Sequence, residues 1–277
     1  RCAPPTRPIS YSPMMSRWIV THVPSGLILV CLMAIIAGGA VLVSMFVRRR
    51  FAALTGDEHN DVLKFTYGFI GFVYAFFIGF VVSSMWGQIN TADANARTEG
   101  ATAVQLATDT SGFDQAEADR IRHDLVRYTN AAIAEWDQEG NRRAPTADAA
   151  LAQLYATYDQ VKAVTDRQNS LVASAYANLD KLGQARTVRL LTDQQDQGPP
   201  WPLWVVIFLT SALVLGTAIS YGVEKPHLHL PMVAVVGLVV AANLFLIMEL
   251  AHPYTGEIAT TSDSLRETLR VLDTHPS

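Results

Sequence analysis

Four long apolar runs dominate the chain, and they come in two pairs separated by a polar stretch. Each run has close to the ~20 residues that a helix needs to cross the hydrocarbon core of a bilayer. The only acidic or basic residue inside them is Glu249, near the end of the fourth run. The pattern predicts an integral membrane protein whose spans lie at Ser25–Val47, Phe65–Trp86, Trp201–Gly222 and His229–Ala251.

The polar stretch at residues 87–200 has helical periodicity and no strand alternation of any length. Its apolar side chains recur at three- and four-residue steps, which is typical of helices that bury one face. Three such stripes consist of Ile121, Leu125, Tyr128, Ala132 and Trp136; of Leu151, Leu154, Tyr155, Tyr158 and Val161; and of Leu171, Ala175, Leu179 and Leu182. We therefore predict an all-α fold, a four-span helical membrane protein with a helical extramembrane domain inserted between spans two and three.

These patterns divide the chain into five parts. Residues 25–86 form the first transmembrane helix pair, 87–200 the helical domain, 201–251 the second pair and 252–277 a C-terminal tail. Residues 1–24 form an N-terminal segment. Its first 13 residues carry four prolines and no apolar periodicity, so we expect them to be disordered. The native start is expected at Met14 or Met15.

Charge is distributed unevenly along the chain. The formal net charge is −4, and residues 86–200 hold 11 Lys and Arg against 16 Asp and Glu, a difference of −5. An acidic domain argues against nucleic acid as a partner. The cluster Arg48–Arg50 opens the short loop after the first span, and short basic loops face the cytoplasm. We expect the middle domain outside the cytoplasm, although Arg17, Arg186 and Arg189 favour the opposite orientation.

Catalytic and cofactor-binding patterns are absent from the sequence. It contains no HExxH, CxxC, GxSxG or phosphate-loop pattern, which makes a membrane enzyme the least favoured class of function. The two cysteines, Cys2 and Cys31, are too few for a metal cluster, and Cys31 falls in the first span as a small apolar packing residue. We expect no catalytic residue, no cofactor and no metal site.

The second span is rich in both aromatic and small residues. Small residues at three- and four-residue steps let helix backbones approach closely in lipid. The alternative is a pore-lining helix whose aromatic side chains form a hydrophobic constriction in an oligomer. The two interpretations are compatible if each applies to one face. The candidate residues for pore lining or helix packing are Gly68, Gly71, Phe72, Ala75, Phe76 and Gly79.

The fourth span contains the candidate intramembrane acid, Glu249. A carboxylate within a membrane span is costly and suggests a functional role. Because His252 and Pro253 follow within about one turn, the alternative is that Glu249 reaches the lipid headgroups. His227 and His229 flank the start of this span, where an interfacial role is favoured over a metal site.

Four stretches resemble the pattern of the bacterial bestrophin-like family of membrane proteins. They are NDVLKFTYGFIGFVYAFFIGFVVSSMW from Asn60 to Trp86, ARTEGATAVQL around Glu99, LDKLGQARTVRLL from Leu179 to Leu191, and HPYTGE from His252 to Glu257. The order of two spans, helical domain and two spans also matches over nearly the whole chain after Met15. The family pattern has an aspartate before its final Pro-aromatic-x-Gly, where this chain has His252.

The resemblance implies a homo-oligomeric membrane protein, distantly related to the bestrophin ion channels, for which a pentamer is one candidate. Two of the family-like stretches should lie just beyond the same membrane surface, on antiparallel helices. We therefore expect Arg186 and Arg189 to form a structural charge network with acidic residues, of which Glu99 is the best candidate. The alternative is that all three are solvated charges.

Two functions follow from these patterns. The first is a homo-oligomeric ion channel, or channel-like pore, lined by the second span. The alternative is a non-conducting scaffold or accessory subunit that binds a partner through its helical domain. The expected partners are the lipid bilayer, other copies of the chain and ions, and the expected location is the bacterial plasma membrane.

Overall fold

The computed structural model describes residues 22–50, 60–136, 143–194, 198–220 and 226–274, except for the side chains of residues 60–64, 194 and 226–228. Within these ranges the chain is helical and has no strand. The chain divides into two compact units, which are described separately. The first comprises residues 1–87 and 198–258, and the second comprises residues 88–197 and 259–277. The expected N-terminal disorder and the expected start at Met14 or Met15 lie outside the described residues.

The first unit contains four helices that are long and apolar enough to cross a membrane. They are α2 (Ser25–Arg50), α7 (Trp201–Ser220), α8 (Pro226–Leu250) and the part of α3 (Asn60–Asp109) up to Gly87. The predicted all-α fold with four spans is confirmed, and the chain is a multi-pass membrane protein. Helix α2 continues through Arg50, beyond the predicted end of the first span at Val47, and α7 is described up to Ser220.

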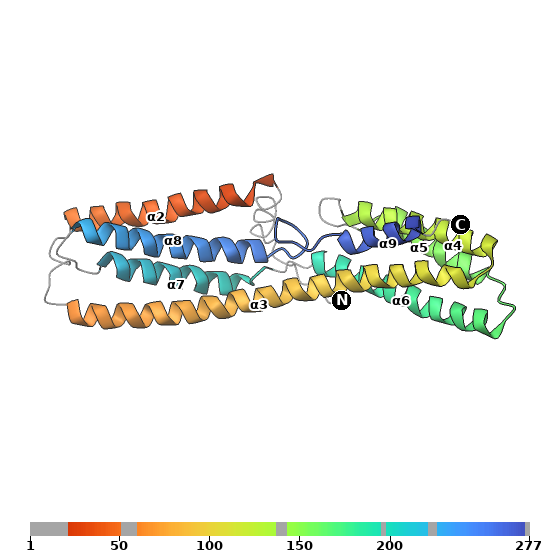
Figure 1. The fold of residues 1–277 in the computed structure, drawn as a ribbon. Coiled ribbons are helices and arrows are strands. Elements are labelled where there is room, and N and C mark those ends of the chain that lie inside the picture. The colour runs from red at the N-terminus through yellow and green to blue at the C-terminus, as the bar shows by residue number, and fades with distance from the viewer. Residues whose placement is uncertain (1–21, 51–59, 137–142, 195–197, 221–225, 275–277) are drawn as a thin grey trace, which may run out of the picture. The chain divides into compact units, whose positions relative to one another are not determined.

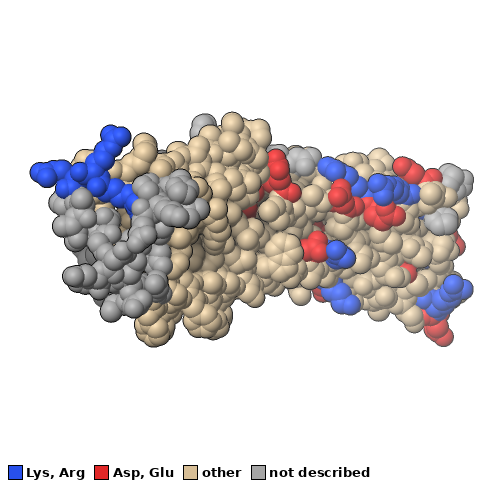
Figure 2. Space-filling view, turned by 60° about the vertical axis from the view of Figure 1, so that its left-hand side comes forward, with Lys and Arg blue, Asp and Glu red and all other residues tan. Residues whose placement is uncertain are grey.

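Packing in the first unit centres on α8. This helix lies along α2 and also contacts α7 (Figure 1). Most large side chains on the outside of the unit are apolar, as expected for helices that meet lipid. Figure 2 shows the consequence, a surface of uncharged residues with Lys and Arg side chains gathered at one end of this unit.

The second unit contains the rest of α3, η3 (Thr110–Gly112), α4 (Gln115–Trp136), α5 (Pro145–Asp159), α6 (Asp166–Gln194) and α9 (Asp263–Thr274). In this unit α4 packs against both α5 and α9, and α5 packs against α6. The apolar stripes of the sequence supply the core, because Ile121, Leu125, Leu154, Leu179 and Leu182 are all fully buried. The apolar stripes therefore form the buried side of the helices in this unit.

The C-terminal segment contributes to the second unit instead of forming a separate tail. Helix α9 buries Leu265, Thr268 and Leu272, which lie at three- and four-residue steps. It docks on α3 where Gly100 leaves room, since a Cβ at Gly100 would lie 2.4 Å from the Ser264 carbonyl oxygen. The amphipathic pattern of this short helix needs a partner surface, and α3 and α4 provide it.

Candidate functional site

The membrane part of α3 exposes a row of phenylalanine rings. The exposed fractions are 79% for Phe65, 60% for Phe69, 71% for Phe72, 73% for Phe76 and 69% for Phe80. The opposite face is buried inside the unit and includes Tyr74, whose hydroxyl accepts a hydrogen bond of 3.4 Å from Ser211 on α7. One face of α3 therefore packs within the first unit, and the aromatic face meets none of the other described helices.

Gly68, Ala75 and Gly79 lie on or beside this outward face, whereas Gly71 lies on the same side as the buried Tyr74. A Cβ placed on Gly68, Gly71 or Gly79 would meet no other described atom within 4 Å, helix neighbours aside. Ala75 is also exposed. The predicted close helix contact at Gly71 and Gly79 is therefore not found between the described helices of one chain. A contact with another copy stays a prediction.

Helices α2 and α8 run antiparallel and are held in register at three levels. Ser25 Oγ donates a hydrogen bond of 3.0 Å to Glu249 at one end. Gly237 meets Ala37 in the middle, where a Cβ on the glycine would lie 2.7 Å from the Ala37 Cα. Successive contacts, including the third one described next, are separated by nearly the same number of residues on α2 as on α8. They therefore fix a single register.

The third level of this contact is a buried serine–histidine pair. Ser44 Oγ lies 3.0 Å from His229 Nε2, and neither residue is exposed to solvent. The sequence placed His229 at the membrane interface, but the structure buries it between helices. The serine on the facing helix explains this difference, because it offers a hydrogen bond that an apolar neighbour would not. The side chain of His227 lies outside the described residues.

Glu249 is buried inside the first unit, with an exposed fraction of 2%. Only its Oε1 atom has a hydrogen-bond partner among the described residues, namely Ser25, while Oε2 is buried without one. The backbone N–H of Ser25 also donates a bond of 3.4 Å to Glu257, which follows the end of α8. The side chain thus points into the α2–α8 contact.

A buried charge cluster lies in the second unit around Arg189, which has no exposed surface. Its Nε atom donates a hydrogen bond of 3.0 Å to Glu99, and Nη2 donates one of 3.1 Å to Glu135. Its guanidinium carbon lies 4.5 Å from the ring centroid of Trp136, a cation–π contact. Arg189 on α6 therefore joins α3 and the end of α4.

Arg186, one turn earlier on α6, completes the cluster. It forms two hydrogen bonds with Glu135, of 2.9 and 2.6 Å, in the parallel arrangement that suits a guanidinium and a carboxylate. It donates a third bond of 2.8 Å to Asp148, near the start of α5. Glu135 also accepts a bond of 2.7 Å from the backbone N–H of Ala144. The cluster therefore holds four helices together.

The surroundings of these groups keep the charges in place. Burial raises the pKa of Glu135, but hydrogen bonds from Arg186 and from the Ala144 N–H outweigh it, so this pKa lies below its ordinary value. Burial lowers the pKa of Arg189, whereas Glu99 and Glu135 raise it more, so the guanidinium stays charged. Burial and then Glu99 raise the pKa of Tyr128, whose phenol stays neutral. Buried charges of opposite sign therefore stabilise one another in this cluster.

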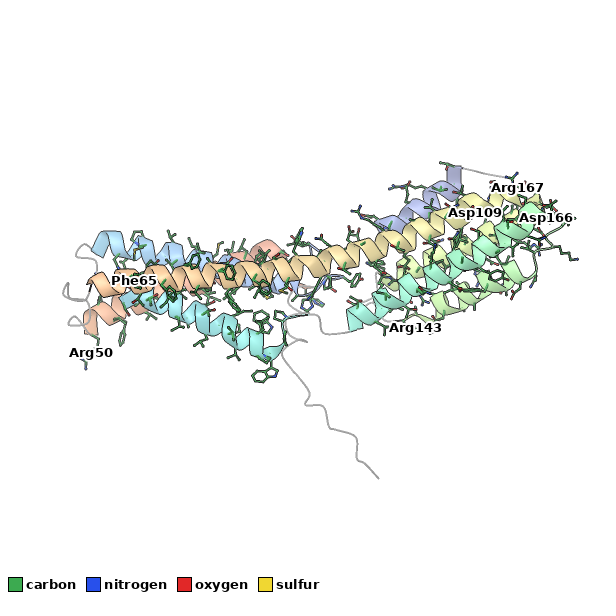
Figure 3. The ribbon with its side chains drawn as sticks, turned by 90° about the horizontal axis from the view of Figure 1, so that it is seen from below. Arg50, Phe65, Asp109, Arg143, Asp166 and Arg167 are labelled. Carbon is green, nitrogen blue, oxygen red and sulfur yellow. The ribbon has the colours of Figure 1, made fainter. Side chains whose placement is uncertain are left out.

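The structure brings Glu99 and Arg189 together, but it gives Arg186 partners that the sequence analysis missed. These are Glu135 and Asp148. A signal for Glu135 was present, because it lies seven residues after Tyr128 and hence on the buried face of α4. Asp148 lies near Arg143, which Figure 3 places at the end of the second unit opposite Asp109 and Asp166.

Metal coordination finds no support in the described part of the chain. Among the residues that the structure describes, no group of three or more His, Cys, Asp or Glu side chains is arranged to hold a metal ion. The polar side chains of the buried charge cluster already bind one another. Among the described residues, the main features are therefore an exposed aromatic face on α3 and a buried cluster of ion pairs in the second unit.

Comparisons with known proteins give one family match and two similar solved structures. The model of the bestrophin-like domain matches residues 34–265. A solved structure of a bacterial bestrophin homologue from Klebsiella pneumoniae, in a point-mutant form, has a TM-score of 0.67 and 12% identity, over 88% of this chain and 98% of that one. A second structure, named only as a membrane protein, has a TM-score of 0.60 and 14% identity, over 91% and 98%.

At these identities the two structures show a shared fold and nothing more. The sequence matches no curated protein at a significant level. The family model, by contrast, covers most of the chain, from the middle of α2 to the start of α9. The protein therefore belongs to the bestrophin-like family.

Proposed function

We propose that the chain is a subunit of a homo-oligomeric ion channel whose pore is lined by the outward face of α3. Membership in the bestrophin-like family supports a channel function, because this family resembles the bestrophins, which are ion channels. The observation that carries the assignment of the pore is the row of five exposed phenylalanines, with small residues beside them and no packing partner among the described residues.

The physical character of this face suits a gate. Phe72 and Phe76 lie about one turn apart, so copies of α3 around an axis would place successive rings of aromatic side chains along the path. Rings of this kind form a hydrophobic constriction that opens and closes by wetting and dewetting. Gly79 and its neighbours let the helices approach closely enough to narrow the path.

A second candidate function is a non-conducting scaffold that binds a partner through the second unit. The observation that favours it is a groove of about 780 Å³ between α5 and α6, lined by Tyr155, Asp180 and Arg186 among others. Tyr155 donates a hydrogen bond of 2.8 Å to Asp180 there. The two functions differ in one measurable respect, since only the channel passes ions.

The assembly is tested by electron microscopy of the purified full chain. We expect particles with rotational symmetry and an axial path between copies of α3, because the small residues beside the aromatic rings permit close contact between helices of different copies in lipid. Five-fold symmetry would match the pentamer suggested by the resemblance to bestrophins. A monomeric particle would contradict the channel, because one chain offers no closed path.

We also propose that the protein lies in the bacterial plasma membrane with its second unit outside the cytoplasm, based on the cluster Arg48–Arg50 in the last turn of α2, before the short connection to the second span. In a variant with Cys2 and Cys31 replaced by serine, Ser111→Cys should react with a membrane-impermeant thiol reagent in intact cells. Thr55→Cys, in the short loop between the first two spans, should react only after the cells are opened. The reverse pattern would overturn this orientation.

A further inference from the structure

The C-terminal half of α2 has a face that matches the two parts of a phospholipid. Leu42 and Phe46 are exposed, with fractions of 64% and 63%. Arg49 and Arg50 in the last turn are exposed as well. Steps of four, seven and eight residues from Leu42 bring all four to one side of the helix. The opposite side, with Ala37, Ala40 and Ser44, is buried.

The apolar part of this face has the length of one bilayer leaflet. Ile35, with an exposed fraction of 70%, begins it, and Phe46 ends it. At a rise of 1.5 Å per residue this stretch is about 16 Å long, and one leaflet contributes about half of a hydrocarbon core of ~30 Å. Figure 3 places Arg50 at the same end of the first unit as Phe65, where a described membrane span begins. The arginines thus lie at the level of the headgroups.

The charges at the two ends of α2 differ in sign. The described carboxylates of the first unit, Glu249 and Glu257, both contact Ser25 at its N-terminal end. The described basic side chains of the unit are at the other end (Figure 2). An arginine presents planar N–H groups that bind phosphate oxygens in pairs. The last turn of α2 therefore presents two exposed guanidinium groups that can bind a phosphate.

We propose that this face of α2 is a binding site for an anionic phospholipid. Its phosphate is held by Arg49 and Arg50, and one acyl chain lies along Phe46, Leu42 and Ile35. Each basic residue at an anionic membrane surface strengthens attraction about fivefold. The site therefore selects an acidic headgroup over a zwitterionic one, and its preference weakens as salt screens the charges.

The test titrates the purified full chain in neutral detergent and follows its thermal unfolding. Phosphatidylglycerol should raise the unfolding temperature, whereas phosphatidylcholine with the same acyl chains should raise it much less. Inorganic phosphate, which has no acyl chain, should leave it unchanged. Equal effects of the two lipids would overturn selection by charge, and an equal effect of phosphate would replace the lipid site by a simple anion site.

The variant R49Q/R50Q should weaken the apparent affinity for phosphatidylglycerol by about 25-fold, a factor of five for each arginine. R49K/R50K keeps the charge and should retain the preference for phosphatidylglycerol over phosphatidylcholine. The matched control is R266Q/R270Q on α9, which removes two exposed arginines of the second unit and should bind as the wild type does. Unchanged lipid selectivity in R49Q/R50Q would refute the proposal. The same result is expected if a second copy of the chain, and not a lipid, covers this face.

Discussion

Replacement of Arg189 by methionine is expected to lower the free energy of unfolding of the second unit by about 3–5 kcal/mol. The reason is that methionine fills much of the same space but leaves Glu99 buried without its guanidinium partner, and an uncompensated buried charge is strongly destabilising. Glu99 has no exposed surface from which it could reach water. Glu135 keeps its bonds to Arg186, so most of the loss should arise at Glu99.

The matched control for this variant is Arg97→Met on α3. Arg97 forms a bond of 2.8 Å with Asp93, shorter than those of Arg189, but its side chain is 77% exposed. A pair of that kind contributes only ~0–1 kcal/mol. Hydrogen exchange of the α4 amides in the full chain would measure the free energy of unfolding of the second unit in both variants. Similar losses in the two variants would show that burial of Arg189 does not determine its contribution.

A double-mutant cycle apportions the effect within the cluster. The coupling free energy between Glu99→Gln and Arg189→Gln should exceed about 0.5 kcal/mol, as is usual for residues in one network. The coupling between Glu99→Gln and Arg186→Gln should be smaller, because the bonds of Arg186 go to Glu135 and Asp148.

Replacement of Gly237 by alanine is expected to destabilise the first unit by about 1–3 kcal/mol. The added methyl group would lie 2.7 Å from the backbone of Ala37, which cannot rotate away as a side chain could. Shifting α2 as a whole would strain the Ser25–Glu249 and Ser44–His229 hydrogen bonds on either side. Helices α2 and α8 would therefore have to separate.

Gly216→Ala on α7 is the control for this variant. A Cβ at Gly216 would meet no other described atom within 4 Å, helix neighbours aside. This variant should unfold at the wild-type temperature or slightly above it, since alanine favours helix over glycine. Thermal unfolding of both proteins in the same detergent makes the comparison. A wild-type unfolding temperature for Gly237→Ala would mean that α2 and α8 do not touch at this level.

The spans were predictable because lipid imposes a simple rule on sequence. A segment that crosses the bilayer needs about 20 apolar residues, and the four runs of this chain satisfy that rule almost without interruption. The helical character of the second unit was predictable for a related reason, since each of its helices buries one stripe such as Ile121, Leu125 and Tyr128.

Side-chain partners between helices were harder to predict, because period and composition define a face but not its neighbour. The sequence indicated that Arg189 needs a carboxylate, and the proximity of Glu99 followed from the membrane-surface argument. It did not show that Glu135 would bridge both arginines, which depends on how α4 packs. The contact of Gly237 with Ala37 likewise depends on the register of α2 and α8, which hydrophobicity alone leaves open.

The most direct test of the proposed channel is ion flux through the purified chain in liposomes, with one cysteine placed on the outward face of α3. In a variant with Cys2 and Cys31 replaced by serine, Phe76→Cys should conduct and should lose most of its flux when a charged thiol reagent is added. Val205→Cys, on the exposed side of α7, should keep its flux under the same treatment. Absence of flux in the wild type, or equal block at both positions, would contradict a pore lined by α3.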